Sequence, residues 1–255
     1  MINLKTFDWN LNNVDTVLFD KDGTIQDLHV YWGEIVKMRS RSLVDDFKLK
    51  PVFFKKICLW MGYDLSQKKL LEKGPVGVLS REEIIDQLAV NFKKNSIEIS
   101  RKETSVLFNK IHEKFLLKMD NFVKILPGIK NLLIILKKRS VKIAIVTSDS
   151  VKNAKRCMEL LKLDMYIDQY IGREHSILPK TLGKHAKIAL DLLGSKRENT
   201  VCFGDAPMDL IMARNSGLKA GIGIALGQTP FNKLLKYSKY ILNSYRELIV
   251  SQAYK

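Results

Sequence analysis

Short apolar runs alternate with amphipathic segments along the second half of the chain, and one such run also lies near the start. We predict strands over Thr16–Phe19, Lys142–Val146, Tyr166–Ile171, Thr200–Phe203 and Ala220–Ala225. Apolar residues at helical spacing predict helices over Ile129–Lys138, Val151–Lys162, His185–Leu193 and Met208–Asn215. Short strands that alternate with helices predict an α/β fold with a parallel sheet and helices on both of its faces.

Residues 26–126 show a different pattern, with mostly helical spacing and few strand signals. Amphipathic helices are predicted over Glu82–Phe92 and Glu103–Leu117. A Gly-Pro-Val-Gly segment at 74–77 interrupts the region, and Pro127 and Gly128 mark its end. We therefore predict a core domain of residues 1–25 and 127–255, with a helical domain of residues 26–126 inserted into it.

Composition and charge narrow the classes of protein that fit. The chain has 255 residues, of which 46% are hydrophobic, as in an ordinary globular protein. Lys and Arg number 43 against 27 acids, a net charge of +16, but this charge is diffuse, so we expect an anionic small molecule as partner and no nucleic acid. No apolar run reaches the ~20 residues of a membrane span, and the N-terminus lacks the pattern of a signal peptide. Three scattered cysteines fit a cytoplasmic protein in which each is a small buried residue.

Acidic, hydroxyl and basic side chains gather where the predicted strands end. The parallel strands of an open α/β sheet bind ligands at their carboxyl ends, so residues that directly follow strands are candidates for one site. These candidates are Asp20, Asp22, Thr147, Ser148, Lys180, Lys184, Asp205 and Asp209. Clustered carboxylates repel one another unless a cation joins them, and hard oxygen ligands suit Mg²⁺. A hydroxyl and a lysine suit the oxygens of a phosphate, so the set predicts phosphoryl transfer.

The segments DKDGT, IVTS and GDAPMD, with a lysine between the last two, resemble the four motifs of the haloacid dehalogenase superfamily. The helical insertion directly after the first motif is similar to the type 1 cap of that superfamily. The resemblance covers essentially the whole chain. It implies a Rossmann-like three-layer core with a helical cap domain, and a Mg²⁺-dependent phosphatase of the phosphoglycolate phosphatase type.

The resemblance also implies roles for individual residues. Asp20 would attack phosphorus and form an aspartyl-phosphate, and Asp22 would serve as general acid and then base. Gly23, directly after Asp22, would give the turn there a conformational freedom that a side chain would obstruct. The metal ligands would be Asp20, the backbone carbonyl of Asp22, and Asp205, with Asp209 in support.

Thr147 and Ser148 would bind phosphate oxygens, and a lysine would neutralise the phosphate and the nucleophile. We favour Lys180 for this lysine, because its spacing from Asp205 matches the superfamily, and keep Lys184 as the alternative. In the insertion, His29 and Trp32 are three residues apart and share a helix face, so both are candidates for substrate contacts. The alternative, to which we give equal weight, is that His29 is a surface residue and Trp32 belongs to the core of the inserted domain. The segment at 74–77 is either a specificity loop or a simple turn.

Two other functions compete with a phosphatase. A phosphomutase uses the same acids, and a regulatory protein could use them only to bind metal and phosphate. The second acid, Asp22, and the inserted domain argue against the regulatory protein, because receiver domains of that kind are far shorter. The sequence leaves the substrate and the oligomeric state open.

Overall fold

The computed structural model describes residues 1–253, which form two compact units by their internal contacts. Among these residues, one unit comprises 1–27 and 125–253, and the other comprises Leu28–Lys124. The sequence analysis set the corresponding boundaries at residues 25/26 and 126/127.

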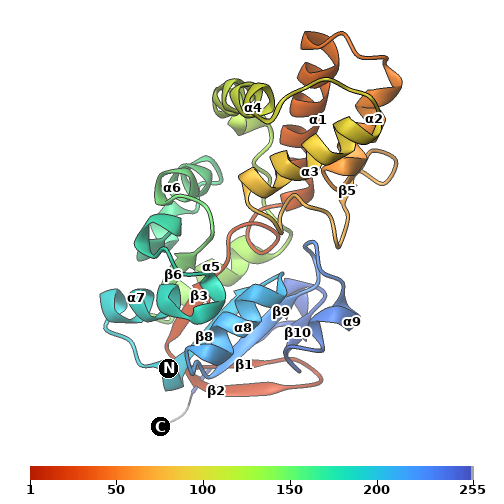
Figure 1. Ribbon diagram of the computed structural model, residues 1–255. Helices are drawn as coiled ribbons and strands as arrows, with labels where there is room; N and C mark the ends of the chain where they lie inside the picture. Colours follow the sequence, from red (N-terminus) through yellow and green to blue (C-terminus); the bar gives the residue numbers. More distant parts are fainter. Residues whose placement is uncertain (254–255) are drawn as a thin grey trace. The chain divides into compact units, whose positions relative to one another are not determined.

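A parallel sheet of six strands organises the first unit, in the order β10-β9-β8-β3-β6-β7 (Figure 1). The strands are β3 (Thr16–Phe19), β6 (Lys142–Val146), β7 (Gln169–Ile171), β8 (Thr200–Gly204), β9 (Ala220–Ile224) and β10 (Ile241–Leu242). The central strand β3 pairs in parallel with β6 on one side and β8 on the other. All four residues of β3 are buried, as expected for a strand covered on both faces. The predicted α/β class is confirmed.

Helices flank this sheet and follow its strands in the chain: α5 (Ile129–Lys138), α6 (Val151–Leu160), α7 (Lys184–Leu193), α8 (Pro207–Asn215) and α9 (Phe231–Leu234). Apolar residues of α7 and α8 pack on Leu18, Ala144 and Cys202 of the central strands. The neighbours of these residues in the strands point the opposite way. There the rings of Phe19 and Phe203 stack at 4.9 Å.

Two parts of the first unit differ from the sequence prediction. A separate antiparallel sheet, absent from that prediction, joins β1 (Ile2–Lys5), β2 (Asn10–Val14) and β11 (Ile249–Gln252). The predicted strand over Tyr166–Ile171 is too long, because a 3-10 turn occupies Asp164–Tyr166 and Ile167 N donates to Asp164 O. The edge strand β10 was also missed.

The second unit is mainly helical, with α1 (Leu28–Asp46), α2 (Val52–Trp60), α3 (Arg81–Lys94) and α4 (Arg101–Leu116). Capping boxes begin α3 and α4: the side chains of Ser80 and Ser100 accept from the amides of Glu83 and Glu103, which cap in return. The helices share a hydrophobic core of their own. The unit also contains a short antiparallel hairpin that the sequence analysis did not predict, with two residues in each strand: β4 (Tyr63–Asp64) and β5 (Lys69–Leu70).

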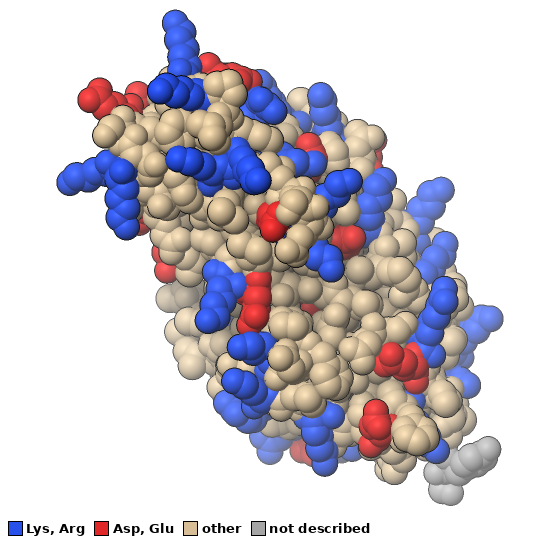
Figure 2. All heavy atoms as spheres, turned by 90° about the vertical axis from the view of Figure 1, so that its right-hand side faces the viewer, with Lys and Arg blue, Asp and Glu red and all other residues tan. Residues whose placement is uncertain are grey.

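Lys and Arg side chains are spread over the face shown in Figure 2, with acidic and uncharged residues between them. Within residues 1–253, no helix is both long enough and apolar enough to cross a membrane. The three cysteines are buried, as predicted.

Candidate active site

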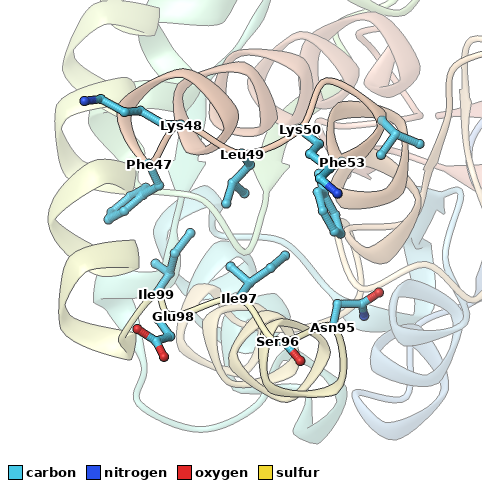
Figure 3. Close-up of a pocket in the computed structure, with 11 residues that line it drawn as sticks. Phe47, Lys48, Leu49, Lys50, Phe53, Asn95, Ser96, Ile97, Glu98 and Ile99 are labelled. Carbon is cyan, nitrogen blue, oxygen red and sulfur yellow. The ribbon is translucent and has the colours of Figure 1, made fainter.

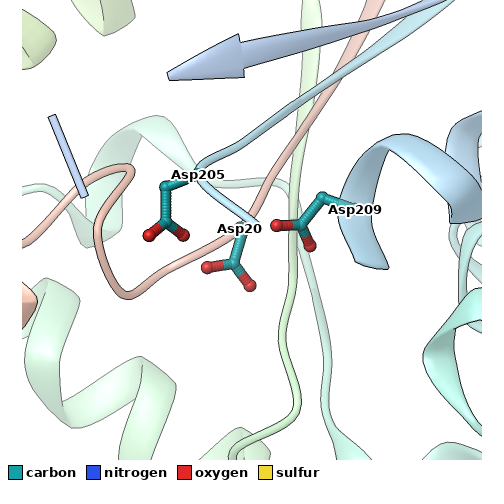
Figure 4. Close-up of side chains that lie close together, drawn as sticks. All are labelled: Asp20, Asp205 and Asp209. Carbon is teal, nitrogen blue, oxygen red and sulfur yellow. The ribbon is translucent and has the colours of Figure 1, made fainter. Parts of the chain in front are cut away.

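Three carboxylates meet at the carboxyl edge of the parallel sheet. Asp20 directly follows β3, Asp205 directly follows β8, and Asp209 lies in the first turn of α8. One carboxylate oxygen from each lies within 4.8 Å of the others, and Figure 4 shows Asp209 reaching from α8 toward Asp20. The backbone holds two of these segments together, because Asp20 N donates to Phe203 O at 2.8 Å. Adjacent parallel strands thus deliver acids that are 185 residues apart in the sequence to one place.

Lys180 places its ammonium between two of these acids. Its Nζ lies 2.7 Å from Asp20 Oδ1 and 2.6 Å from Asp209 Oδ1, and the residue is only 7% exposed. Burial lowers the pKa of this ammonium, but the charges of Asp20 and Asp209 outweigh burial and raise the pKa above its usual value. The alternative, Lys184, is exposed at the first residue of α7. The geometry therefore distinguishes the two lysines that the sequence left as alternatives.

The cluster has an excess of negative charge. Burial raises the pKa of Asp20 to about 6, with Asp209 adding to the shift and Lys180 opposing it. Burial also raises the pKa of Asp205, and the nearby Asp20 and Asp209 raise it further. Three carboxylates cluster here and the ammonium of Lys180 contacts two of them, so the donor set fits a divalent cation, which prefers oxygen ligands and would relieve the repulsion.

Two glycines make room for this cluster. A Cβ at Gly204 would overlap the side chain of Asp209, and a Cβ at Gly227 would overlap the carboxylate of Asp205. The backbone next to Gly227 also contributes, because Gln228 N donates to Asp205 Oδ2 at 2.9 Å. The sequence analysis missed Gly227 and Gln228, since no local signal ties a loop after β9 to an acid after β8.

Asp22 lies in a second set of charges beside the first. Lys21 is fully buried, and its Nζ lies 2.9 Å from Asp22 Oδ1 and 3.3 Å from Asp149 Oδ2. Gln26 Nε2 also donates to Asp22. Burial raises the pKa of Asp22, and Lys21 opposes that shift. The sequence analysis missed Lys21 and Asp149, although both adjoin residues that it selected.

The turn around Asp22 depends on Gly23. Gly23 has φ +75°, which favours glycine, and its amide donates to Gln26 O at 2.8 Å. Gln26 then forms an isolated bridge with Ile125, where the chain returns from the second unit.

Thr147 and Ser148 follow β6, the neighbour of β3. Thr147 is buried, and its Oγ1 accepts from Asp149 N at 3.2 Å. Ser148 is exposed and its Oγ lies 4.0 Å from Met208 Sδ, in the first turn of α8. Because β6 runs parallel to β3, both residues lie at the same edge of the sheet as Asp20.

His29 and Trp32 lie in α1 of the second unit. His29 Nδ1 accepts from Leu70 N at 3.1 Å and so ties α1 to the hairpin of that unit. Trp32 packs against the hydrophobic core of the second unit, with its ring 5.3 Å from that of Tyr31. The partners in these two contacts, Leu70 and Tyr31, belong to the second unit. The segment at 74–77 packs there too, since Gly74 lies directly against Gly62.

The second unit also contains a cavity of about 620 Å³ at the turns α1–α2 and α3–α4 (Figure 3). Six of its eleven lining residues are apolar, and Leu49 and Ile97 point toward one another across it. Glu98 is the one acid among its lining residues, so this cavity does not offer the chemistry of the acid cluster.

Known proteins resemble the chain in sequence. The family model for haloacid dehalogenase-like hydrolases matches residues 14–217. A protein of Caldanaerobacter subterraneus with the provisional name pyrophosphatase PpaX is 33% identical over 57% of the chain and 62% of its own length. A phosphoglycolate phosphatase of Caulobacter vibrioides is 22% identical over 85% of the chain and 81% of its own length. The chain spans 44–62% of the length of three curated relatives that it matches, two of them named pyrophosphatase PpaX and one named phosphatase IndB.

Solved structures share the fold. A predicted phosphoglycolate phosphatase from Haemophilus somnus has a TM-score of 0.70 at 15% identity, over 92% of the chain and 96% of its own. A protein of Thermotoga maritima solved under the provisional name beta-phosphoglucomutase has a TM-score of 0.67 at 17% identity, over the same shares. The family model spans most of the chain and both segments of the acid cluster, and the chain therefore belongs to the haloacid dehalogenase-like hydrolases.

Proposed function

We propose that the chain is a Mg²⁺-dependent phosphatase that hydrolyses a small phosphorylated metabolite, of the phosphoglycolate or sugar phosphate type. The observation that carries the proposal is the placement of Lys180 between Asp20 and Asp209, whose carboxylates cluster with that of Asp205. An ammonium at 2.7 Å from Asp20 is placed to neutralise both this carboxylate and an incoming phosphate.

The first half-reaction would use Asp20 and Asp22. A carboxylate oxygen of Asp20 attacks phosphorus, the bond from phosphorus to the ester oxygen breaks, and the leaving oxygen takes a proton from Asp22. Burial raises the pKa of Asp22, which favours the protonated form that this step needs. Thr147 and Ser148 would donate hydrogen bonds to phosphate oxygens.

The second half-reaction would regenerate Asp20. Asp22, now ionised, takes a proton from a water molecule, the water oxygen attacks phosphorus, and the bond from phosphorus to Asp20 breaks to release inorganic phosphate. Lys180 remains beside Asp20 through both steps and stabilises the charge on the phosphoryl oxygens.

Asp20, Asp205 and the backbone carbonyl of Asp22 would hold Mg²⁺, with Asp209 in support. When bound, the ion supplies positive charge that offsets repulsion between the phosphate and the nucleophile. Asp209 would support the site in a second way, by fixing Lys180.

The names of similar proteins support the proposed substrate class. Pyrophosphatase and phosphoglycolate phosphatase are the names of similar proteins, and both substrates are small and anionic. The second unit would act as the cap domain that selects the substrate, with His29 and Trp32 as candidate contacts.

The test is a phosphate-release assay over phosphoglycolate, pyrophosphate and several sugar phosphates, in Mg²⁺ and in EDTA. We expect release with Mg²⁺ and none with EDTA, and loss of release in Asp20→Asn. Asp8→Asn, an exposed acid of the same unit, is the control. Isomerisation of a sugar phosphate with little free phosphate would indicate a mutase, and unchanged release in Asp20→Asn would refute the proposal.

A further inference from the structure

Arg39 is a buried cation in the interior of the second unit. It lies in α1, is 5% exposed, and its guanidinium carbon lies 4.1 Å from the centre of the Phe108 ring on α4. Its Nε is shut off from solvent and has no hydrogen-bond acceptor. A ring face compensates part of the charge, but it does not replace the hydrogen bonds that a guanidinium loses on burial.

A second guanidinium lies beside the same ring. The Arg81 guanidinium carbon is 5.9 Å from the centre of Phe108, and its Nη2 donates to Ser105 O at 3.1 Å. The Nε of Arg81 is also buried without an acceptor. Among residues 1–253, no carboxylate oxygen lies within 4 Å of a nitrogen of Arg39 or Arg81.

The two like charges therefore disfavour each other. Burial lowers the pKa of Arg39 to about 9, and the charge of Arg81 lowers it further. Arg41, two residues along α1, shows the contrast: it lies 4.1 Å over the Phe54 ring, but it is exposed and keeps its hydration. Stacking on a ring thus does not require burial, and a buried guanidinium beside a second positive charge is costly unless an anion joins the two.

We propose that Arg39 and Arg81 form a binding site for an oxyanion, the carboxylate or phosphate group of a small molecule, within the second unit. A planar guanidinium presents paired donors that match the two oxygens of either group. The two buried Nε–H donors are the unsatisfied groups that such an anion would accept from. Both arginines belong to the second unit and the acid cluster to the first, so this site does not depend on the proposed function.

The test is an NMR titration of the full chain in EDTA with inorganic phosphate and, separately, with malonate. We expect saturable shifts of amide and arginine Nε signals around Arg39, Arg81 and Phe108. Arg39→Met should weaken this binding at least tenfold, and Arg81→Gln should weaken it as well. Arg41→Met is the matched control and should leave it unchanged. Tighter binding of phosphate or of malonate identifies the group.

Two results would overturn the site. One is a set of shifts confined to the first unit, around Thr147 and Lys180, which would place the phosphate elsewhere. The other is an Arg39→Met protein that loses the same thermal stability with and without phosphate, because Arg39 would then serve packing alone. If Arg39→Met does not fold, the half-buried Arg81→Gln decides, and binding unchanged in that variant would refute the site.

Discussion

At the scale of single residues, the acid cluster depends on the positive charge of one lysine, which offsets the repulsion between carboxylates. Lys180 is the cation that contacts both Asp20 and Asp209, and all three are at most 8% exposed. Removing one partner of such a buried group leaves the others without compensation, which is far more damaging than the loss of a surface ion pair.

Replacement of Lys180 by methionine tests this position. We expect Lys180→Met to lower phosphate release by at least about 100-fold, because the charge beside the phosphate is lost. In EDTA, its free energy of unfolding near neutral pH should fall by about 3 kcal/mol, because Asp20 and Asp209 then repel each other unrelieved. Lys184→Met is the control, since Lys184 is exposed, and equal effects in the two variants would contradict this role.

The raised pKa of Asp20 predicts a pH dependence of stability. The pKa is about 6 in the folded chain against 3.8 in the reference state, so between these values the folded chain binds more protons and stability falls as pH rises. In EDTA, the free energy of unfolding of the wild type relative to Asp20→Asn should fall by up to about 3 kcal/mol from pH 4 to pH 7. Chemical unfolding at several pH values measures this difference, and a flat difference would contradict the shift.

At the scale of elements, the site is set by where strands end and by how closely loops approach them. Gly204 ends β8 without a side chain, and Asp209 fills the space that a side chain would take. A side chain at position 204 would therefore displace Asp209 from the place where it meets Asp20 and Asp205.

Gly204→Ala should disrupt this packing. The new methyl group would overlap Asp209, so we expect a loss of about 1–3 kcal/mol in stability and a fall of about 10- to 100-fold in phosphate release. Gly194→Ala is the control: Gly194 has φ +56° but open space around it, so its variant should lose about 1 kcal/mol and keep its activity. Equal activity in both variants would show that Asp209 tolerates displacement.

The elements of the site were predictable from the sequence because their signals are local. β6 and α5 lie over the predicted residues, since a continuous apolar run and a strong apolar stripe each need no distant partner to be recognised. β1, β2 and β11 were missed because each is only four or five residues long and their sheet is completed by pairing between β1 and β11, from the two ends of the chain. Gln228 and Lys21 were missed for the same reason: only the folded loops bring them to Asp205 and Asp149.

At the scale of the whole molecule, the chain leaves the first unit once and returns to it beside the point of departure. Leu126 N donates to Ile25 O at 2.9 Å, and Gln26 bridges to Ile125. These two crossings lie next to Asp22, whose carboxylate accepts from Gln26. The inserted unit is therefore joined to the rest of the chain at the residues that hold the proposed general acid.

A divalent cation should stabilise the whole chain through the first unit. Ligands that bind only the folded state raise its stability with concentration, by about 2.7 kcal/mol at 100 times the dissociation constant. Mg²⁺ should therefore raise the melting temperature of the wild type. Asp205→Asn should lose this increase while remaining folded in EDTA, where removal of a buried carboxylate with a raised pKa relieves repulsion.

Asp191→Asn, a change at an exposed acid of α7, should respond to Mg²⁺ as the wild type does. The response should also be larger at pH 7 than at pH 5, because protons compete with the cation for carboxylates whose pKa values are raised. A melting temperature that rises equally with Mg²⁺ in wild type and Asp205→Asn would place the cation outside the acid cluster. Mg²⁺ dependence of phosphate release would then need a different ligand set from the one that Asp20, Asp205 and Asp209 offer.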